Sequence, residues 1–374
     1  MRVIDTVLVK VASRCNLDCS YCYVYHMGDE GWRAQPKRMD ARVSAAVARR
    51  LGELATNQDH PLSVVLHGGE PLMLGWRRLS DLFEELRSAL PASAGLHVQT
   101  NGVLLDDAII ELCLKYDVGI SVSLDGPASV HDAFRRDHLA RGSHGRVMAA
   151  VRRLRDHPRG ERLFSGVLAV VDPGSDPDEV YGFLKATGAP SFDFLYRDGN
   201  HDALPPGKAA SSTTEYGGWM VRVLELYLAD RQPPRIRVLD DMFRLLLGGV
   251  SSKEGVGLAE YGILVIDTDG SVAKNDTLKS ARAGADRFAN RWSVLEHQLA
   301  DIVVSPEFAA YHALQAPTAA KCRACPNLSV CGGGMPTHRF SIERGLDNPS
   351  VFCADQTLLI ERMRQVLQRR RSAA

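Results

Sequence analysis

Three cysteines near the N-terminus have a spacing that can hold an iron–sulfur cluster. Cys15, Cys19 and Cys22 form a C-x3-C-x2-C pattern directly after an apolar alternating run at 6–12. A [4Fe–4S] cluster usually takes four cysteines. No fourth cysteine is near in the sequence, so one iron would stay open to a chelating ligand. The competing interpretation is a zinc site, which needs four nitrogen or sulfur ligands and has His26 as its extra candidate.

A second motif ends the next predicted strand. The run V-V-L-H at 64–67 is followed by Gly68, Gly69, Glu70 and Pro71. The two glycines let the backbone come close to a ligand, and the Glu70 carboxylate can accept a hydrogen bond from an ammonium group. An ordinary turn from strand to loop is the alternative. Both motifs together, in this order and on successive strands, make a stronger signal than either one alone.

The two motifs resemble those of the radical S-adenosylmethionine (SAM) superfamily. The resemblance implies that Cys15, Cys19 and Cys22 bind three irons and that the amino and carboxylate groups of SAM fill the open iron. It also implies that the stretch 68–71 holds the SAM amino group. Tyr21, before the third cysteine, resembles the aromatic residue beside the adenine, although packing against its own loop is an equal alternative.

Further residues for a SAM pocket lie at the ends of later predicted strands: Asn101, Ser121, Ser123 and Asp125. For Asn101, a plain turn cap is a strong alternative. The stretch 125–135, D-G-P followed by H-D-A-F-R, resembles a segment common in peptide-modifying radical SAM enzymes. In those enzymes an arginine pairs with the SAM carboxylate, which suits the bidentate guanidinium. Arg135 fits this spacing, and Arg136 is the substitute.

A second cysteine group lies near the C-terminus: Cys322, Cys325, Cys331 and Cys353. Four cysteines suffice for one closed cluster, and by spacing alone the same four can hold zinc. The region resembles the SPASM extension of peptide-maturing radical SAM enzymes, which usually carries two auxiliary clusters on seven cysteines. Here Met335 stands where a further cysteine is expected, and Asp276 lies near another such place. We therefore predict one auxiliary [4Fe–4S] cluster, besides the SAM-binding cluster and SAM.

The first half of the chain alternates short β-type runs with helical patterns, which indicates βα units and a parallel sheet. Strands are predicted at 6–11, 63–66, 96–100, 119–124, 165–171 and 192–195, and helices at 41–55, 77–90, 106–116, 145–155 and 177–187. These repeats fit the partial (β/α)6 TIM-like barrel of the resembled superfamily, so the predicted fold class is α/β. The proposed SAM-site motifs all follow predicted strands, where such barrels carry their sites.

Three regions are predicted: a radical SAM partial barrel at 1–200, bridging helices at 201–259, and a smaller SPASM-like auxiliary cluster domain at 260–374. The bridging helices are expected at 217–228 and 238–247. The last region should contain a hairpin at 261–273 with an Asp-Gly turn, short helices near 293–300 and 306–314, the cysteine-rich loop 321–353 and a helix at 354–368.

Composition narrows the functional class. The 374 residues include 45 Lys plus Arg and 45 Asp plus Glu, a net charge of zero that argues weakly against nucleic-acid or membrane partners. The sequence shows no signal-peptide pattern and no apolar run long enough to span a membrane. We therefore expect a cytoplasmic protein. In a reducing compartment the two cysteine groups indicate metal binding rather than disulfides, whereas Cys113 is most simply a buried apolar residue.

The resemblance implies the chemistry. Reduction of the first cluster cleaves SAM to a 5′-deoxyadenosyl radical, which takes a hydrogen from a bound peptide. Residues 331–353 resemble the subgroup that cross-links side chains in ribosomally synthesised peptides, including cyclophane formers. The leading prediction is therefore a maturase that forms a cyclophane-type C–C or ether cross-link, with the auxiliary cluster as electron acceptor. Candidates for the catalytic base are loop residues, namely Asp198, His201, Asp267, Asp269 and Asp276.

Other functions stay open. Anaerobic sulfatase maturases oxidise Cys or Ser to formylglycine, but the expected lack of a second auxiliary cluster weakens that reading. A peptide epimerase, a thioether synthase and a non-enzymatic zinc-binding interaction module are further alternatives. The resemblance implies a precursor peptide and an electron donor such as a flavodoxin or ferredoxin as partners. The predicted strand at 6 and helix at 354–368 leave no room for a leader-binding domain, so we expect direct leader binding, for instance as an added strand, or a separate leader-binding protein.

Overall fold

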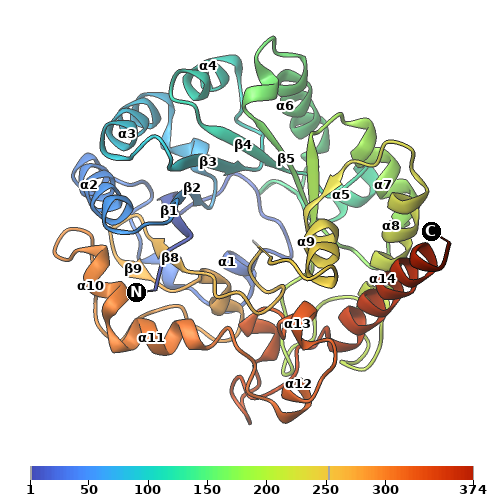
Figure 1. The fold of residues 1–374 in the computed structure, drawn as a ribbon. Coiled ribbons are helices and arrows are strands. Elements are labelled where there is room, and N and C mark those ends of the chain that lie inside the picture. The colour runs from blue at the N-terminus through green and yellow to red at the C-terminus, as the bar shows by residue number, and fades with distance from the viewer. Residues whose placement is uncertain (1, 252, 374) are drawn as a thin grey trace.

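A computed structural model describes residues 2–251 and 253–373, with side chains up to residue 370. Its centre is one open sheet in the order β7-β6-β5-β4-β3-β2-β1-β8-β9, curved into an arc (Figure 1). Neighbouring strands run parallel apart from the antiparallel pair β8 and β9. The strands are β1 (Thr6–Ala12), β2 (Ser63–Gly68), β3 (Gly95–Thr100), β4 (Gly119–Ser123), β5 (Phe164–Val170), β6 (Ser191–Leu195), β7 (Arg235–Ile236), β8 (Ile263–Ile266) and β9 (Val272–Ala273).

Helices cover the outer face of the arc, and the C-terminal region closes its open side (Figure 1). The outer helices are α2 (Ala41–Asn57), α3 (Trp76–Ala89), α4 (Asp107–Lys115), α6 (His144–Asp156), α7 (Pro177–Ala186) and α8 (Glu215–Ala229). The remaining helices are α1 (Tyr23–His26), α5 (Ala128–Phe134), α9 (Arg237–Leu246), α10 (Leu299–Val304), α11 (Pro306–Ala313), α12 (Ala320–Arg323), α13 (Leu328–Cys331) and α14 (Cys353–Ala373). Helices α1 and α9 lie inside the ring.

Local sequence explains why the outer helices form where they do. Asp40 caps α2 by accepting a hydrogen bond from the backbone N–H of Val43, and Asp106 caps α4 in the same way. Aspartate at this position satisfies backbone donors that the first helical turn leaves unpaired. The apolar stripe of α2 includes Val47 and Leu51, which are fully buried. This stripe lies on the outer face of the sheet (Figure 1), and strands β2, β3 and β4 alternate fully buried residues with half-buried ones.

The predicted βα repeats are confirmed, with bounds that differ by one or two residues. The helix predicted near 293–300 is wrong at its start, because α10 begins at Leu299. Ser293 instead holds a turn: its hydroxyl accepts from the N–H of Leu295, and its carbonyl accepts from the N–H of His297. A serine side chain that bonds the nearby backbone competes with helix formation.

The sheet does not stop at the predicted end of the barrel. Strand β8 pairs with β1 in parallel, with Val7 opposite Leu264, and then turns through Gly270 into β9 as the predicted hairpin. The long helix α14 packs along α8. The three-region division at residues 200 and 259 stays a prediction, but the C-terminal region extends the sheet directly. Among the described residues, no helix is long and apolar enough to cross a membrane.

A buried ion pair fastens α14 to the rest of the molecule. The Lys208 ammonium lies 2.5 Å from the Asp355 carboxylate, and both side chains are fully buried. The second Asp355 oxygen accepts from the backbone N–H of Gly217, at 2.7 Å, at the start of α8. Because both charges are desolvated, each depends on the other for compensation.

Replacing Asp355 by Ala should therefore destabilise the protein strongly. The change removes the nearest counter-charge of the buried Lys208 ammonium, which keeps only the Thr213 carbonyl at 2.7 Å and the more distant Glu215 carboxylate at 3.7 Å. Breaking a buried ion pair in this way costs up to about 3–5 kcal/mol. Urea denaturation measures the free energy of unfolding. The control is Asp347→Ala at the exposed Arg344–Asp347 pair, with an N–O distance of 3.3 Å, where the loss should be much smaller because exposed ion pairs contribute little. Equal losses in the two variants would contradict this account of α14.

Candidate active site

A cavity of about 570 Å³ lies at the carboxyl ends of the barrel strands. Its volume is in the usual range of small-molecule sites. Three parts of the chain line it: the strand ends, with Cys15 and Glu70; the interior helix α9, with Met242; and the C-terminal region, with Cys331 and His338. The C-terminal region thus supplies a wall of the same cavity that the strand ends open into.

The three N-terminal cysteines all line this cavity on one loop between β1 and α1. The backbone N–H of Cys22 donates to the Cys19 carbonyl, at 2.9 Å, and turns the loop back on itself. Burial raises the pKa of Cys15 to about 12 and that of Cys22 to about 11. These thiols stay protonated in the absence of a metal, whereas a bound metal replaces the proton outright.

His26, the extra zinc-ligand candidate, pairs with Asp18 at 2.7 Å instead. Among the described residues, no group of three or more His, Cys, Asp or Glu side chains is arranged to hold a single metal ion. A [4Fe–4S] cluster gives each cysteine its own iron, so its ligands need not converge on one ion. The donor set of three sulfurs around a cavity fits such a cluster.

A second loop clasps the cysteine loop. The backbone N–H groups of Asp18 and Ser20 donate to the carbonyls of residues 136 and 134, at 2.7 and 3.1 Å. An imidazole nitrogen of His138 lies 3.0 Å from the Cys15 carbonyl oxygen. The clasping loop, residues 134–143, follows α5 and carries Arg135. The positions of the cysteines and of this arginine are therefore set together.

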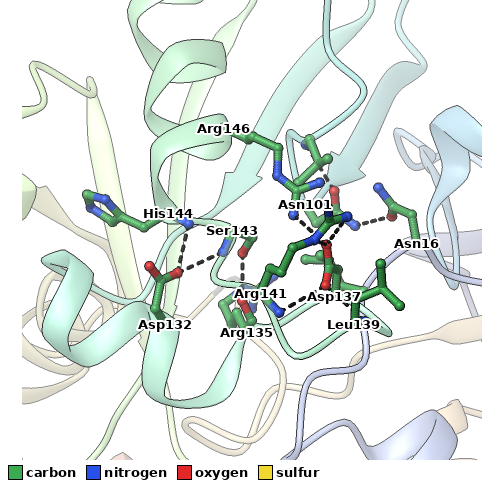
Figure 2. A network of polar contacts seen from close by, with 12 residues as sticks. Asn16, Asn101, Asp132, Arg135, Asp137, Leu139, Arg141, Ser143, His144 and Arg146 are labelled. Carbon is green, nitrogen blue, oxygen red and sulfur yellow. Dashed lines mark hydrogen bonds and ion pairs between the residues drawn. The ribbon is translucent and has the colours of Figure 1, made fainter.

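Figure 2 shows what keeps the clasping loop in shape. Asp137 accepts from the backbone N–H groups of Leu139 and Arg141, both at 3.0 Å, and from the Arg141 guanidinium at 2.9 Å. The Arg141 hydrogen bond is the main reason why the pKa of Asp137 falls to about 2. Asp132 accepts from the N–H groups of Ser143 and His144, at 2.8 Å each, and fixes the other end of the loop.

The motif at residues 68–71 packs directly on the cysteine loop. A Cβ on Gly69 would lie 2.1 Å from the Tyr25 hydroxyl and 2.3 Å from the Arg14 carbonyl oxygen. Gly68, at φ +143°, would place a Cβ 2.1 Å from the Ala12 carbonyl oxygen. Neither position tolerates a side chain. The prediction explained these glycines by close approach of a ligand, and the structure adds close approach of the cysteine loop itself.

Glu70 is a buried residue of the cavity lining, and three hydrogen-bond donors hold its carboxylate. Its carboxylate accepts from the Thr100 hydroxyl at 2.6 Å, the Asn101 N–H at 2.8 Å and the Leu72 N–H at 3.0 Å. Burial raises its pKa, and these hydrogen bonds act against that effect. An ionised carboxylate has about four acceptor positions, so one remains for a ligand ammonium. The Asn101 amide donates to Asn16, at 2.7 Å (Figure 2), and lies 3.6 Å from the Cys15 sulfur.

Tyr21, Arg135 and Asp125 form a buried chain. The Arg135 guanidinium donates to the Tyr21 hydroxyl at 2.6 Å, and this hydroxyl donates to the Asp125 carboxylate at 2.5 Å. Arg135, the predicted partner of the SAM carboxylate, is thus already engaged by the protein. Its Nε is buried and has no hydrogen-bond partner among the described residues, which leaves one donor for a ligand. Ser123 also lines the cavity, and its hydroxyl accepts from the Gln99 amide at 3.0 Å. Ser121, two residues earlier in β4, is half-buried and is not among the residues that line the cavity.

The C-terminal cysteines lie close enough to influence one another electrostatically. Burial raises the pKa of Cys331 to about 12, and the proximity of Cys353, Cys322 and Cys325 raises it further. Cys331 alone of the four lines the cavity among the described residues, and its thiol lies 2.6 Å from the Gln356 amide oxygen. The glycines 332–334 that follow all have positive φ. A Cβ on Gly332 would lie 2.0 Å from the Gly257 carbonyl oxygen, so the chain packs too closely here for a side chain.

The base candidates separate into two groups. Asp198 and Asp276 line the cavity. His201 instead donates from its ring to the Pro349 carbonyl at 2.8 Å, and the turn residues Asp267 and Asp269 accept from neighbouring backbone N–H groups. These three residues hold loops together and have no contact with the cavity in the described structure.

Asp276 lies in a buried polar cluster with Lys10 and Tyr23, and the sequence did not predict that these three residues meet. Its carboxylate lies 2.7 Å from the Lys10 ammonium and accepts from the Tyr23 hydroxyl at 3.0 Å. Burial alone would raise the pKa of Asp276, but Lys10, together with His67 and Lys279, lowers the pKa to about 2. The other carboxylate oxygen is buried and has no hydrogen-bond partner among the described residues.

Other cavity residues were also missed. His338 lies 3.6 Å from Asp198, and Arg197 precedes that aspartate. Glu254 accepts from the Asn275 amide at 2.6 Å, and burial raises its pKa to about 7. The position of His338 seven residues after Cys331 was an available signal. Glu254 stands in a loop without a motif, so nothing in the sequence pointed to it.

Comparison with known proteins identifies the class. Residues 9–186 match the family model described as the radical SAM superfamily. A cysteine-type anaerobic sulfatase-maturating enzyme of Clostridium perfringens (strain 13 / Type A) is 23% identical over 363 residues, which cover 93% of each chain. Residues 9–186 thus form a radical SAM domain, the part of an enzyme that uses SAM and a [4Fe–4S] cluster.

Solved structures show the same fold over most of the chain. Native anSMEcpe with bound AdoMet and Cp18Cys peptide is 20% identical, with a TM-score of 0.81, and the match covers 97% of this chain and 99% of that chain. Streptococcus suis SuiB bound to precursor peptide SuiA is 14% identical, with a TM-score of 0.61, covering 90% of this chain and 72% of that chain. The predicted SPASM-like architecture is therefore similar to known enzyme structures.

His131 beneath the site makes stability depend on pH. Its Nδ1 accepts from the Asp125 N–H at 3.3 Å, and its Nε2 lies 2.9 Å from the Ser143 hydroxyl oxygen. Burial lowers its pKa to about 2, with smaller contributions from the charges of Arg135 and His144. The unfolded chain, with a histidine pKa of about 6.5, therefore binds more protons below that pH. Stability is complete above about pH 6.5 and falls as the pH decreases.

Replacing His131 by Gln should reduce this pH dependence. From pH 7 to pH 5, the wild-type free energy of unfolding should fall by about 2 kcal/mol more than that of the variant, at about 1.4 kcal/mol per pH unit below pH 6.5. Denaturant titrations of anaerobically prepared protein at several pH values measure the difference. His60→Gln is the control with the same substitution; its side chain is 40% exposed and pairs with Asp5, and the variant should retain the part of the slope that depends on His131. An unchanged slope in His131→Gln would refute the assignment.

Proposed function

We propose that the protein is a radical SAM maturase that modifies a ribosomally synthesised peptide, most specifically by forming a side-chain cross-link. The observation that carries the proposal is the shared cavity: Cys15, Cys19 and Cys22 line one side of it, and Cys331 and His338 of the C-terminal region line another. A peptide side chain placed between these walls would lie between both cysteine groups. Similar enzymes are described as sulfatase-maturating or as bound to a precursor peptide, which supports a peptide substrate.

The residues present fit the two cofactors. Cys15, Cys19 and Cys22 would hold the SAM-binding cluster, and Cys322, Cys325, Cys331 and Cys353 would hold one auxiliary cluster. When bound, the first cluster and SAM supply hydrogen-atom abstraction from an unactivated carbon, and the protein orients that chemistry. Glu70, through its remaining acceptor position, would bind the SAM amino group. The free Nε donor of Arg135 would bind the carboxylate.

The proposed cross-linking reaction also needs a side chain of the protein that accepts a proton. Cross-linking to an aromatic ring removes a hydrogen atom from one carbon and then an electron and a proton from the ring, with the auxiliary cluster region as the proposed electron acceptor. We propose Asp276 as the proton acceptor, because one of its oxygens is buried in the cavity wall without a partner. Lys10 keeps this carboxylate ionised, and Tyr23 orients it. Asp198 beside His338 is the second candidate.

Formylglycine formation is the second candidate function. The likeness to sulfatase-maturating enzymes favours this function. The cysteine count weakens it, because the C-terminal region has four cysteines, whereas the two-cluster SPASM extension has seven. Mass spectrometry separates the two products. A cross-link removes a pair of hydrogens and blocks fragmentation between the joined residues. Formylglycine leaves an aldehyde that reacts with hydroxylamine. Epimerisation changes no mass, and a thioether requires a cysteine in the peptide.

The partners also remain proposals. The precursor peptide would bind the cavity, and a flavodoxin or ferredoxin would supply the electron. Strands β7 and β9, at the two edges of the sheet, have two residues each. Such short edges offer little backbone for an added peptide strand, which favours a separate leader-binding protein. Anisotropy of a fluorescent precursor peptide, with and without candidate partners, tests this point. The cytoplasmic location stays a prediction.

The cofactor content is the first test. Anaerobically reconstituted wild type should contain about eight irons per chain, and Cys15→Ala/Cys19→Ala/Cys22→Ala should retain about four, because each [4Fe–4S] cluster carries four irons. Iron and sulfide assays with EPR measure this, and SAM should perturb the wild-type signal only. Protein with zinc and without iron would refute the enzyme and support the zinc-binding module. A content of about four irons and one zinc per chain would mean that the C-terminal cysteines bind zinc, which cannot accept an electron.

The proton acceptor is tested by Asp276→Asn. Loss of a general base typically costs about 10²–10⁴ in rate, so peptide product should fall by at least about a hundredfold. Because the change also removes the counter-charge of the buried Lys10, product is compared per bound iron. Release of 5′-deoxyadenosine in the absence of peptide should persist in protein with wild-type iron content. The control is Asp269→Asn, an exposed turn residue with the same chemical change. Full product formation by Asp276→Asn, with wild-type iron content, would shift the assignment to Asp198.

A further inference from the structure

Arg197 is a buried cation in the cavity wall that no role above explains. It follows β6, lines the cavity and is 6% exposed. Its guanidinium carbon lies 4.0 Å from the centre of the Phe134 ring and 5.9 Å from that of Tyr21. Contacts with aromatic faces attract a cation but use none of its N–H donors. The side chain is therefore held in place while its hydrogen-bonding edge stays available.

That edge is not satisfied by the protein. Nε and Nη2 are both buried, and neither has a hydrogen-bond partner among the described residues. Asp172 approaches Nη2 to 3.2 Å, but without the geometry of a hydrogen bond, and its carboxylate accepts from the Gly174 N–H at 3.3 Å. A guanidinium carries five N–H donors in a planar fork. Donors buried without acceptors are costly, so the arrangement calls for an anionic ligand.

Arg135 provides the contrast. Its guanidinium donates to the Tyr21 hydroxyl at 2.6 Å and lies 3.6 Å from Asp125. Arg197 also has a counter-charge, since Asp172 lies 3.2 Å away. Both guanidinium carbons lie 5.9 Å from the centre of the Tyr21 ring. The two arginines therefore differ in their buried donors without a hydrogen-bond partner among the described residues, which are Nε alone in Arg135 but Nε and Nη2 in Arg197.

We propose that Arg197 binds a carboxylate of the peptide substrate, from an Asp or Glu side chain or from the C-terminus. The planar fork matches two carboxylate oxygens, and the aromatic contacts hold it ready before the peptide arrives. Arg197 would then select acidic peptides and fix their register in the cavity. This inference rests on the proposed peptide function and adds to it the chemical class of the bound group. The carboxylate of SAM is the rival source of the same chemistry.

The test compares acidic and neutral peptides that are otherwise identical. The probes are capped octapeptides of Gly and Ser with a central Tyr, labelled with tetramethylrhodamine, with Glu or Gln placed at each position in turn. Fluorescence anisotropy on reconstituted, SAM-loaded protein under anaerobic conditions measures affinity. Wild type should bind at least one Glu peptide roughly tenfold or more tightly than its Gln twin, as a charge-assisted hydrogen bond predicts. Arg197→Gln should lose this preference.

Control variants separate specificity from damage. Arg237→Gln changes another arginine of the same cavity, which is 54% exposed and lies 3.6 Å from Asp193, and it should keep the preference for Glu. Arg197→Lys retains the charge without the fork and should keep part of the preference. Iron content and thermal midpoint show whether each variant is folded. If Arg197→Gln does not fold, the preference for Glu over Gln peptides is compared between wild type and Arg197→Lys instead. A preference in Arg197→Lys as large as that of wild type overturns the bidentate contact.

The remaining outcomes distinguish the hypotheses. Equal affinity of wild type for all Glu and Gln pairs overturns the role of Arg197 but leaves peptide maturation intact. Absence of binding for every peptide overturns the proposed function and this inference together. Titration calorimetry with SAM forms the last arm: Arg197→Gln should match wild type. A tenfold weaker affinity for SAM with an unchanged peptide preference would assign Arg197 to the cofactor and overturn the proposal.

Discussion

The Lys10–Asp276 ion pair is the contact on which the arrangement of the cavity depends. Lys10 lies in β1, inside a parallel sheet, and a lysine in that position needs a counter-charge. Asp276, which comes after β9, supplies it at 2.7 Å. Tyr23, directly after the cysteine loop, donates to the same carboxylate at 3.0 Å. One carboxylate therefore joins the first strand, the cysteine loop and the C-terminal region.

The same requirement for compensation explains most of the polar interior. Asp125 is matched by Tyr21 and Arg135 beneath the cavity. Glu70 receives three hydrogen bonds, and each buried acceptor thereby keeps a fixed orientation. Arg197 departs from this pattern, since aromatic rings hold it and two of its buried donors lack hydrogen-bond partners among the described residues. Asp172 compensates its charge at 3.2 Å, so the two unsatisfied donors, rather than the charge itself, are the reason to look for a ligand.

The cavity belongs jointly to the barrel and the C-terminal region. Asn200 donates to the Ser280 carbonyl at 3.0 Å, and His201 donates to the Pro349 carbonyl at 2.8 Å. Both contacts fasten the loop after β6 to the C-terminal region. This loop carries Arg197 and Asp198 into the cavity. The two candidate bases in this loop therefore have different roles. Asp198 lines the cavity, whereas His201 joins the loop to the C-terminal region.

The sequence by itself determined the elements of the barrel and the identity of both cysteine groups. Strand β2 and helix α2 were predictable because hydrophobic periodicity and capping residues such as Asp40 are local properties of the chain. Cys15, Cys19 and Cys22 were recognisable because their ligand spacing is also local. The start of α10 escaped prediction, since Ser293 bonds the backbone in a way that periodicity does not reveal.

Only the tertiary structure decided how distant residues meet. The pairing of β8 with β1, the partnership of Lys10 with Asp276 and the meeting of Asp198 with His338 each join segments far apart in the chain. It also reduced the base candidates that face the cavity to Asp198 and Asp276, and it added Arg197 and Glu254. The physical reason is that burial and charge compensation depend on which surfaces pack together, and no local pattern of residues encodes that packing.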